Sequence, residues 1–266
     1  MVVALLRFLN PSARLAPAAR VQLPSRCPRV TLPRQHRRAL SVSASMASPA
    51  NSALVVWLHG LGDSGAGWTD LQQMLGPAMP HVKWVFPDAP VQKVSCNMGM
   101  SMPSWFDLPD IPVTPTCRED PASFKAAVKS VHLRIQKEME ASNIPPERVI
   151  IGGFSQGGAL ATQAMLQYPE KLAGAVCFSG WLVDRDNLQP AIQPANQQTP
   201  LLWCHGESDP TVSHSNQKEG GPLLSSIGVA VEVKSYSGLG HSACPKEFED
   251  LGKWLAKQIP AAELGK

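Results

Sequence analysis

A serine flanked by glycines stands in the middle of the sequence. Residues 153–157 read GFSQG, follow the apolar run 149–152 and precede a stretch of small residues with a helical pattern. In the pattern G-x-S-x-G a sharp strand-to-helix turn exposes the serine hydroxyl, and glycines on either side let the backbone turn without a side-chain collision. The N-terminal N–H groups of the helix would face a developing oxyanion. We therefore predict that Ser155 is a nucleophile.

Two later residues could activate that serine. Where this turn carries chemistry, an acid and then a histidine follow the serine along the chain. Asp209 follows the apolar run 201–206, at the carboxyl end of a predicted strand, where catalytic groups gather in parallel sheets. His241 lies in the small-residue loop 238–242, directly after the last predicted strand. We predict that His241 is the general base and Asp209 the orienting acid of a reaction that forms an acyl-enzyme, which water then cleaves.

The negative charge of such a reaction needs two backbone donors. One should be the N–H of Gln156, the residue after the nucleophile, whose side chain is assigned no chemical role. The other should come from the loop after an early strand, where residues 59–62 read HGLG, and we predict the N–H of Leu61.

The elements that must position these residues alternate between strand and helix from residue 52 onward. Apolar runs predict strands at 53–58, 82–86, 148–154, 173–178, 200–205 and 229–236. Helical patterns cover about 68–79, 124–139, 156–168 and 245–258. This alternation predicts an α/β fold, with a mostly parallel sheet and helices on both of its faces. The Pro-rich stretch 87–120 interrupts the pattern, and its length suggests a binding loop or lid.

Two alternatives use the same features differently. Residues 60–65 also fit G-x-G-x-x-G, and Asp88 follows at the end of the next strand, as in a dinucleotide-binding unit. That interpretation places Asp63 inside a phosphate cradle and leaves Ser155, Asp209 and His241 unexplained. A non-catalytic binding module is the second alternative, and it predicts a degraded triad, whereas this one is complete.

Five motifs together resemble one family. In order they read HGLGD (59–63), PSWFD (103–107), GGFSQGG (152–158), HGxxDP (205–210) and HSxCP (241–245). Over roughly residues 53–260 the chain resembles the acyl-protein thioesterase and lysophospholipase/carboxylesterase family. The resemblance implies an α/β-hydrolase fold without a large cap domain over residues 47–266, and a serine hydrolase that needs no metal or cofactor.

The same resemblance implies the substrates. They are long acyl thioesters on protein cysteines, with lysophospholipids or small acyl esters as the alternative. It places the acyl chain beside residues 97–105, and the flexible apolar side chains there suit a greasy chain of variable shape: Met98, Met100, Met102 and Trp105. The alternative is that these side chains only pin the loop to the core.

Charge is unevenly distributed along the 266 residues. Residues 1–46 hold eight arginines and no acid, which leaves 16 of the 24 basic residues against all 21 acidic ones in the remainder. The folded part is thus mildly acidic, and a nucleic-acid partner is not expected. The Arg-, Ser- and Ala-rich start predicts a targeting segment for a mitochondrion or chloroplast. A start at Met46 would instead leave a cytoplasmic form.

Composition sets further limits. The six cysteines show no C-x-x-C pair and no zinc-type spacing, so neither a metal site nor a disulfide framework is expected. No run of 18 apolar residues occurs, which excludes a transmembrane span and leaves only transient contact with a membrane surface. The sequence does not predict an oligomeric state.

Overall fold

The computed structural model describes residues 51–261. The targeting segment predicted for residues 1–46, and the alternative start at Met46, lie outside this range.

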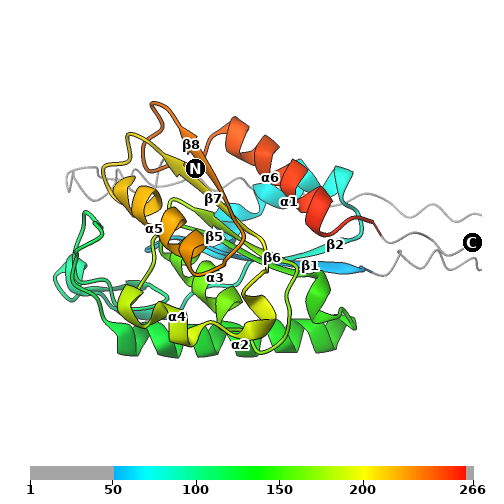
Figure 1. Ribbon diagram of the computed structural model, residues 1–266, viewed down its shortest axis with the longest axis horizontal. Helices are drawn as coiled ribbons and strands as arrows, with labels where there is room; N and C mark the ends of the chain where they lie inside the picture. Colours follow the sequence, from blue (N-terminus) through cyan, green and yellow to red (C-terminus); the bar gives the residue numbers. More distant parts are fainter. Residues whose placement is uncertain (1–50, 262–266) are drawn as a thin grey trace, which may run out of the picture. The chain divides into compact units, whose positions relative to one another are not determined.

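Six parallel strands form the central sheet in the order β2-β1-β5-β6-β7-β8 (Figure 1). Their bounds are Ala53–Leu58 (β1), Val82–Val85 (β2), Val149–Phe154 (β5), Gly174–Phe178 (β6), Leu201–Gly206 (β7) and Val231–Tyr236 (β8). The predicted parallel sheet is confirmed, because all five strand pairs are parallel and each predicted run overlaps one of these strands. Five strands of the sheet are apolar at most positions, whereas the edge strand β8 has no fully buried residue.

Helices cover both faces of the sheet, as predicted (Figure 1). One face carries α2 (Pro121–Ser142), α3 (Gln156–Leu166), α4 (Leu188–Ala191) and α5 (Ser215–Ser226), and the other carries α1 (Asp70–Leu75) and α6 (Pro245–Gln258). Strand β1 shows why both faces of the sheet are covered by helices. Leu54, Val56 and Leu58 pack toward α2 and α3, whereas Val55 and Trp57 pack toward α1 and α6. Successive side chains of a strand point to opposite faces, so a wholly apolar strand must be covered twice.

Helices α4 and α5 and one hairpin were not expected. Helix α5 contains Gly220, Gly221 and Pro222, which in sequence argue against a helix. A Cβ atom at Gly220 would lie 2.6 Å from the ring of Trp203 on β7, so the glycine lets this helix approach the sheet. In the irregular stretch 87–120, β3 (Val91–Lys93) and β4 (Ser101–Pro103) form an antiparallel hairpin. Short 3-10 turns complete the chain, at Gly65–Trp68, Gly76–Ala78, Ser95–Asn97, Pro146–Arg148, Arg185–Asn187 and Pro194–Asn196.

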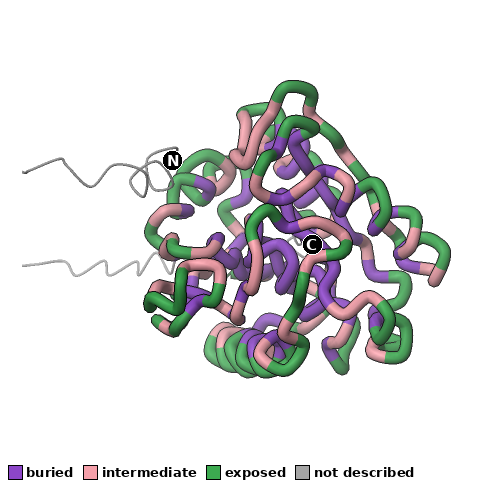
Figure 2. The backbone as a smooth tube through the Cα atoms, turned by 90° about the vertical axis from the view of Figure 1, so that its left-hand side faces the viewer, coloured by how far each residue is buried: buried purple, intermediate pink, exposed green. Residues whose placement is uncertain are grey.

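The centre of the core is helix α3, which directly follows Ser155. All eleven of its residues are buried, and they include Gly157, Gly158 and three alanines. Figure 2 shows the buried segments running through the interior and the exposed ones on the helices and loops outside. No helix between residues 51 and 261 is long and apolar enough to cross a membrane.

Candidate active site

Ser155 occupies a strained turn between β5 and α3. Its φ of 55° and ψ of −120° lie outside the regions that non-glycine residues favour. A Cβ at Gly153 would collide with the backbone of Gly157, and a Cβ at Gly157 would collide with the carbonyl of Leu58. The steric reason given for both glycines is therefore confirmed. Two backbone bonds hold the turn, from Ser155 N to Phe178 O and from Ala159 N to Ser155 O.

The structure brings the three predicted triad residues together. His241 Nε2 lies 3.0 Å from Ser155 Oγ, and His241 Nδ1 lies 2.7 Å from Asp209 Oδ2. Each residue follows the carboxyl end of a parallel strand: β5, β7 and β8. The His241 ring also packs on Phe154, with 4.8 Å between ring centroids. Residues 86 positions apart in sequence thus meet at one edge of the sheet.

Electrostatics determine which nitrogen of His241 carries the proton. Burial alone would raise the pKa of the Asp209 carboxyl, but hydrogen bonds from His205 and His241 hold that pKa well below its usual range. The backbone N–H groups of Thr211 and Val212 also donate to its Oδ1 atom, at 2.8 and 2.9 Å. An ionised carboxylate only accepts, so His241 Nδ1 must donate. Nε2 is then free to accept the Ser155 hydroxyl proton.

The two predicted oxyanion donors are available. Within residues 51–261 the Leu61 N–H donates to no protein acceptor. Gln156 is the first residue of α3, so its N–H has no partner inside the helix. The loop that carries Leu61 is held by neighbours: Gly62, at φ +76°, donates its N–H to Pro103 O at 2.8 Å. The buried imidazole of His59 accepts from Ala89 N at 3.0 Å, so its Nδ1 donates to Gly60 O at 2.7 Å.

The side chain of Gln156, to which the sequence assigned no role, joins the nucleophile turn to the loop after β4. It is fully buried, and its Oε1 accepts from Trp105 N at 2.9 Å. Its Nε2 donates to Ser104 Oγ at 3.0 Å and to Phe106 O at 2.7 Å. Trp105 Nε1 then donates to His59 O at 2.8 Å. The Gln156–Trp105 clamp therefore connects the two loops that carry the predicted oxyanion donors.

The four residues predicted to contact an acyl chain divide into two pairs. Trp105 is part of the clamp, and the sulfur of Met102 lies beside the backbone of Gly62. Met98 and Met100, in contrast, are 86% and 48% exposed at the tip of the hairpin. The structure therefore brings Met102 and Trp105 to the site and leaves the other two in solvent. Their role in binding stays a prediction.

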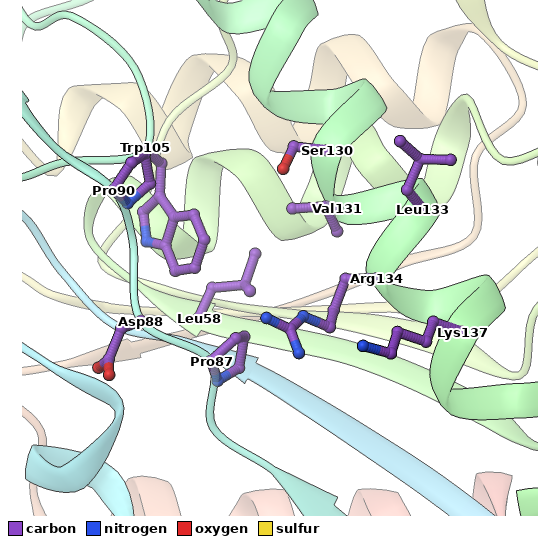
Figure 3. A pocket seen from close by; sticks show the side chains of 10 residues that line it. All are labelled: Leu58, Pro87, Asp88, Pro90, Trp105, Ser130, Val131, Leu133, Arg134 and Lys137. Carbon is purple, nitrogen blue, oxygen red and sulfur yellow. The ribbon is translucent and has the colours of Figure 1, made fainter. Parts of the chain in front are cut away.

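A pocket of about 280 Å³ lies between α2 and the segment after β2 (Figure 3). Its lining residues are Leu58, Pro87, Asp88, Pro90, Trp105, Ser130, Val131, Leu133, Arg134 and Lys137. The side chains of Arg134 and Lys137 reach in from α2, and Trp105 closes the opposite end. None of the three triad residues lines it, so this pocket does not mark the site of the chemistry.

The dinucleotide-binding alternative is not supported, because the acidic residue that it requires, Asp88, is already hydrogen-bonded within the protein. Asp88 would have to receive a ribose, but its Oδ1 accepts from Gly65 N at 2.7 Å, within the same glycine-rich loop. Asp63 in turn accepts from Trp68 Nε1 at 3.1 Å. Both carboxylates hold the loop itself. Among residues 51–261, no group of three or more His, Cys, Asp or Glu side chains could hold a metal ion.

Comparison with known proteins agrees with the resemblance that the five motifs indicated. A family model described as Phospholipase/Carboxylesterase matches residues 41–259. A probable carboxylesterase of Oryza sativa subsp. japonica is 41% identical, with 84% of each chain covered. Acyl-protein thioesterase 1 of Cryptococcus neoformans var. neoformans is 39% identical over 79% of this chain and 94% of that protein. The crystal structure of Arabidopsis thaliana SOBER1 has a TM-score of 0.74 at 37% identity, over 78% of this chain and 99% of that chain.

Proposed function

The chain belongs to the phospholipase/carboxylesterase family of serine hydrolases, and on that basis we propose that it is an acyl-protein thioesterase that uses Ser155, His241 and Asp209. The observation that carries the proposal is the hydrogen-bonded series Ser155 Oγ, His241, Asp209. Thioester cleavage is favoured by relatives of 36–40% identity that bear the name acyl-protein thioesterase 1.

The proposed reaction begins with proton transfer. His241 Nε2 removes the proton from Ser155 Oγ, which attacks the thioester carbonyl carbon. The N–H groups of Leu61 and Gln156 stabilise the oxyanion, and the C–S bond breaks as the departing thiolate takes the proton from His241. Water then attacks the acyl-enzyme, with His241 as general base, and releases the carboxylic acid and the free serine. Asp209 stays ionised throughout and stabilises the imidazolium.

Carboxylesterase activity on small acyl esters is the second candidate. It is supported by the name of the rice relative. An oxygen leaving group would use the same triad and the same oxyanion donors, so the candidates differ in the binding of the acyl chain and the leaving group. The acyl chain would contact Met102 and Trp105 in either case.

Turnover of matched substrates tests both candidates. The full chain would be assayed with a palmitoyl-thioester peptide, with the same peptide carrying a palmitoyl oxyester on serine, and with a short p-nitrophenyl ester. Ser155→Ala should lower kcat/KM for every substrate by several orders of magnitude. Ser226→Ala, at the exposed end of α5, is the matched control and should keep full activity.

The ratio of the rates then separates the candidates. A higher kcat/KM for the palmitoyl thioester than for the other two supports the thioesterase. Preference for the short ester supports the carboxylesterase. Folded protein without any turnover would contradict both, and so would activity that survives Ser155→Ala.

A further inference from the structure

His205 is a buried histidine next to the triad that the proposed reaction does not use. It lies near the end of β7, four residues before Asp209, and its side chain has no exposed surface. Its Nε2 is 2.9 Å from Val212 O and 3.5 Å from Asp209 Oδ2. Oδ2 is the oxygen that faces His241. One imidazole nitrogen thus contacts both the carboxylate and the turn that follows it.

The surroundings of His205 fix its proton. Val212 O can only accept, so Nε2 must carry hydrogen. Nδ1 has no partner among the described residues and is buried. A proton there would be a buried donor without an acceptor, which is unfavourable. His205 therefore carries hydrogen on Nε2, which donates to Val212 O and lies 3.5 Å from Asp209 Oδ2.

The turn from Asp209 to Val212 transmits that contact. The N–H groups of Thr211 and Val212 hold Asp209 Oδ1, so the position of this turn sets the orientation of the carboxylate. The stretch 87–120 also supports this turn, because its Val113 N donates to Thr211 O at 2.8 Å. From the sheet itself, His205 on β7 contacts the same turn through Val212 O.

We propose that His205 is a positioning residue, which holds the Asp209–Val212 turn so that Oδ2 of Asp209 faces Nδ1 of His241. The inference rests on the proposed triad. Histidine is needed here because its ring places an N–H donor at the carbonyl of Val212 while the rest of the side chain stays packed in the core. An apolar side chain of similar size could fill the space but could not hold the turn.

Two variants of equal length separate donation from packing. His205→Met removes the donor, and His205→Gln keeps an N–H donor at a similar distance from the backbone. We expect His205→Met to lower kcat by about tenfold to a hundredfold, because a displaced catalytic group costs rate out of proportion to its movement. KM should stay within about twofold, and Gln should recover most of kcat. His214→Met is the matched control, since His214 is also buried and its ring lies beside that of His205, but it bonds Gln217 and Ser235 instead.

Two NMR measurements complete the test. The downfield proton signal of His241 Nδ1–H should shift in His205→Met and stay in place in His214→Met. In the unmodified protein, ¹⁵N spectra should show His205 with hydrogen on Nε2, and this result does not depend on whether any variant folds. Hydrogen on Nδ1 would overturn the proposal.

Equal kcat values for His205→Met and His214→Met would overturn it as well, and so would a His205→Gln variant as impaired as His205→Met. Failure of the triad itself gives a different result. In that case Ser155→Ala would keep its activity, whatever His205 does.

Discussion

The nucleophile turn and the β3–β4 hairpin are both assigned to the predicted site, but the turn is buried and strained, whereas the hairpin is largely exposed. Ser155 is held in a strained conformation by glycines, by two backbone bonds and by α3, which is buried along its whole length. The hairpin exposes 70% of Val91 and 86% of Met98, and its tip is closed by local bonds such as Gly99 N to Val94 O. A strained turn persists only where its surroundings determine it. We infer that catalysis depends on the buried region and that the hairpin can change without disturbing the triad.

Within the buried region, substitution of the triad acid Asp209 should have the largest effect on kcat. Asp209→Asn keeps the shape of the side chain but can donate to His241, which favours the tautomer with hydrogen on the wrong nitrogen. We expect kcat to fall about 10⁴-fold with little change in KM, the magnitude known for such a change in another serine hydrolase. Asp186→Asn, in the exposed 3-10 turn before α4, is the control. A fall of less than tenfold in Asp209→Asn would remove Asp209 from the triad.

Breaking the Gln156–Trp105 clamp should come second. Gln156→Met preserves length and volume but leaves the amide of Trp105, the hydroxyl of Ser104 and the carbonyl of Phe106 without their partner. We expect kcat for a short ester to fall about a hundredfold, because the two oxyanion loops lose their common support. Steady-state kinetics, together with thermal unfolding, measure this. Gln167→Met, just after α3, is the control, and equal kcat in both variants would contradict the clamp.

Glu247 tests the buried region through pH. It is fully buried, its Oε2 accepts from Cys244 N at 2.9 Å, and burial raises its pKa to about 7. In the folded state the Glu247 carboxyl keeps a proton that the unfolded chain loses near pH 4.5. The contribution of protonated Glu247 to the unfolding free energy is therefore complete below pH 4.5 and is lost as pH rises through 7. Glu247→Gln should flatten the pH dependence of the unfolding free energy and stabilise the protein by roughly 2 kcal/mol at pH 8.

Denaturant unfolding between pH 5 and pH 8 checks this prediction. Glu249→Gln is the matched control on the same helix, because Glu249 is half exposed and its pKa is lowered by its bonds to Lys253 and Lys246. A slope that survives Glu247→Gln would show that another group holds the proton.

The hairpin should give the smallest effect. The double variant Met98→Ser/Met100→Ser should change the unfolding free energy by less than about 0.5 kcal/mol, since both side chains are largely exposed. Turnover of a short ester should stay within about twofold. If the hairpin binds long acyl chains, kcat/KM for a palmitoyl thioester should fall about fivefold, because burying part of an apolar side chain against the substrate contributes about 1 kcal/mol. Leu133→Ser, an exposed position on α2, is the control.

Much of this arrangement is predictable from sequence because it follows from local rules. Buried strands are continuous apolar runs, and both glycines around Ser155 are required by backbone geometry. In a parallel sheet, residues after strand ends meet at one edge, which places Asp209 and His241 beside Ser155. Helix α5 escaped prediction because Gly220 is selected by its approach to Trp203, a contact between distant segments.

The supporting residues of the site escaped prediction for the same reason. Gln156 and His205 are polar side chains whose roles depend on burial and on partners that are distant along the chain or lie across a turn. No spacing rule encodes such contacts. The only available signal was their position, one directly after the nucleophile and the other at the strand end before the acid.

Mass spectrometry of the covalently trapped enzyme would identify the nucleophile itself. The full chain would be treated with a fluorophosphonate that carries a long alkyl chain, digested and searched for the modified peptide. We predict one adduct per chain, on Ser155, with much slower labelling in Asp209→Asn and no labelling in Ser155→Ala. An adduct on another residue, or unchanged labelling of Ser155→Ala, would show that Ser155 is not the nucleophile.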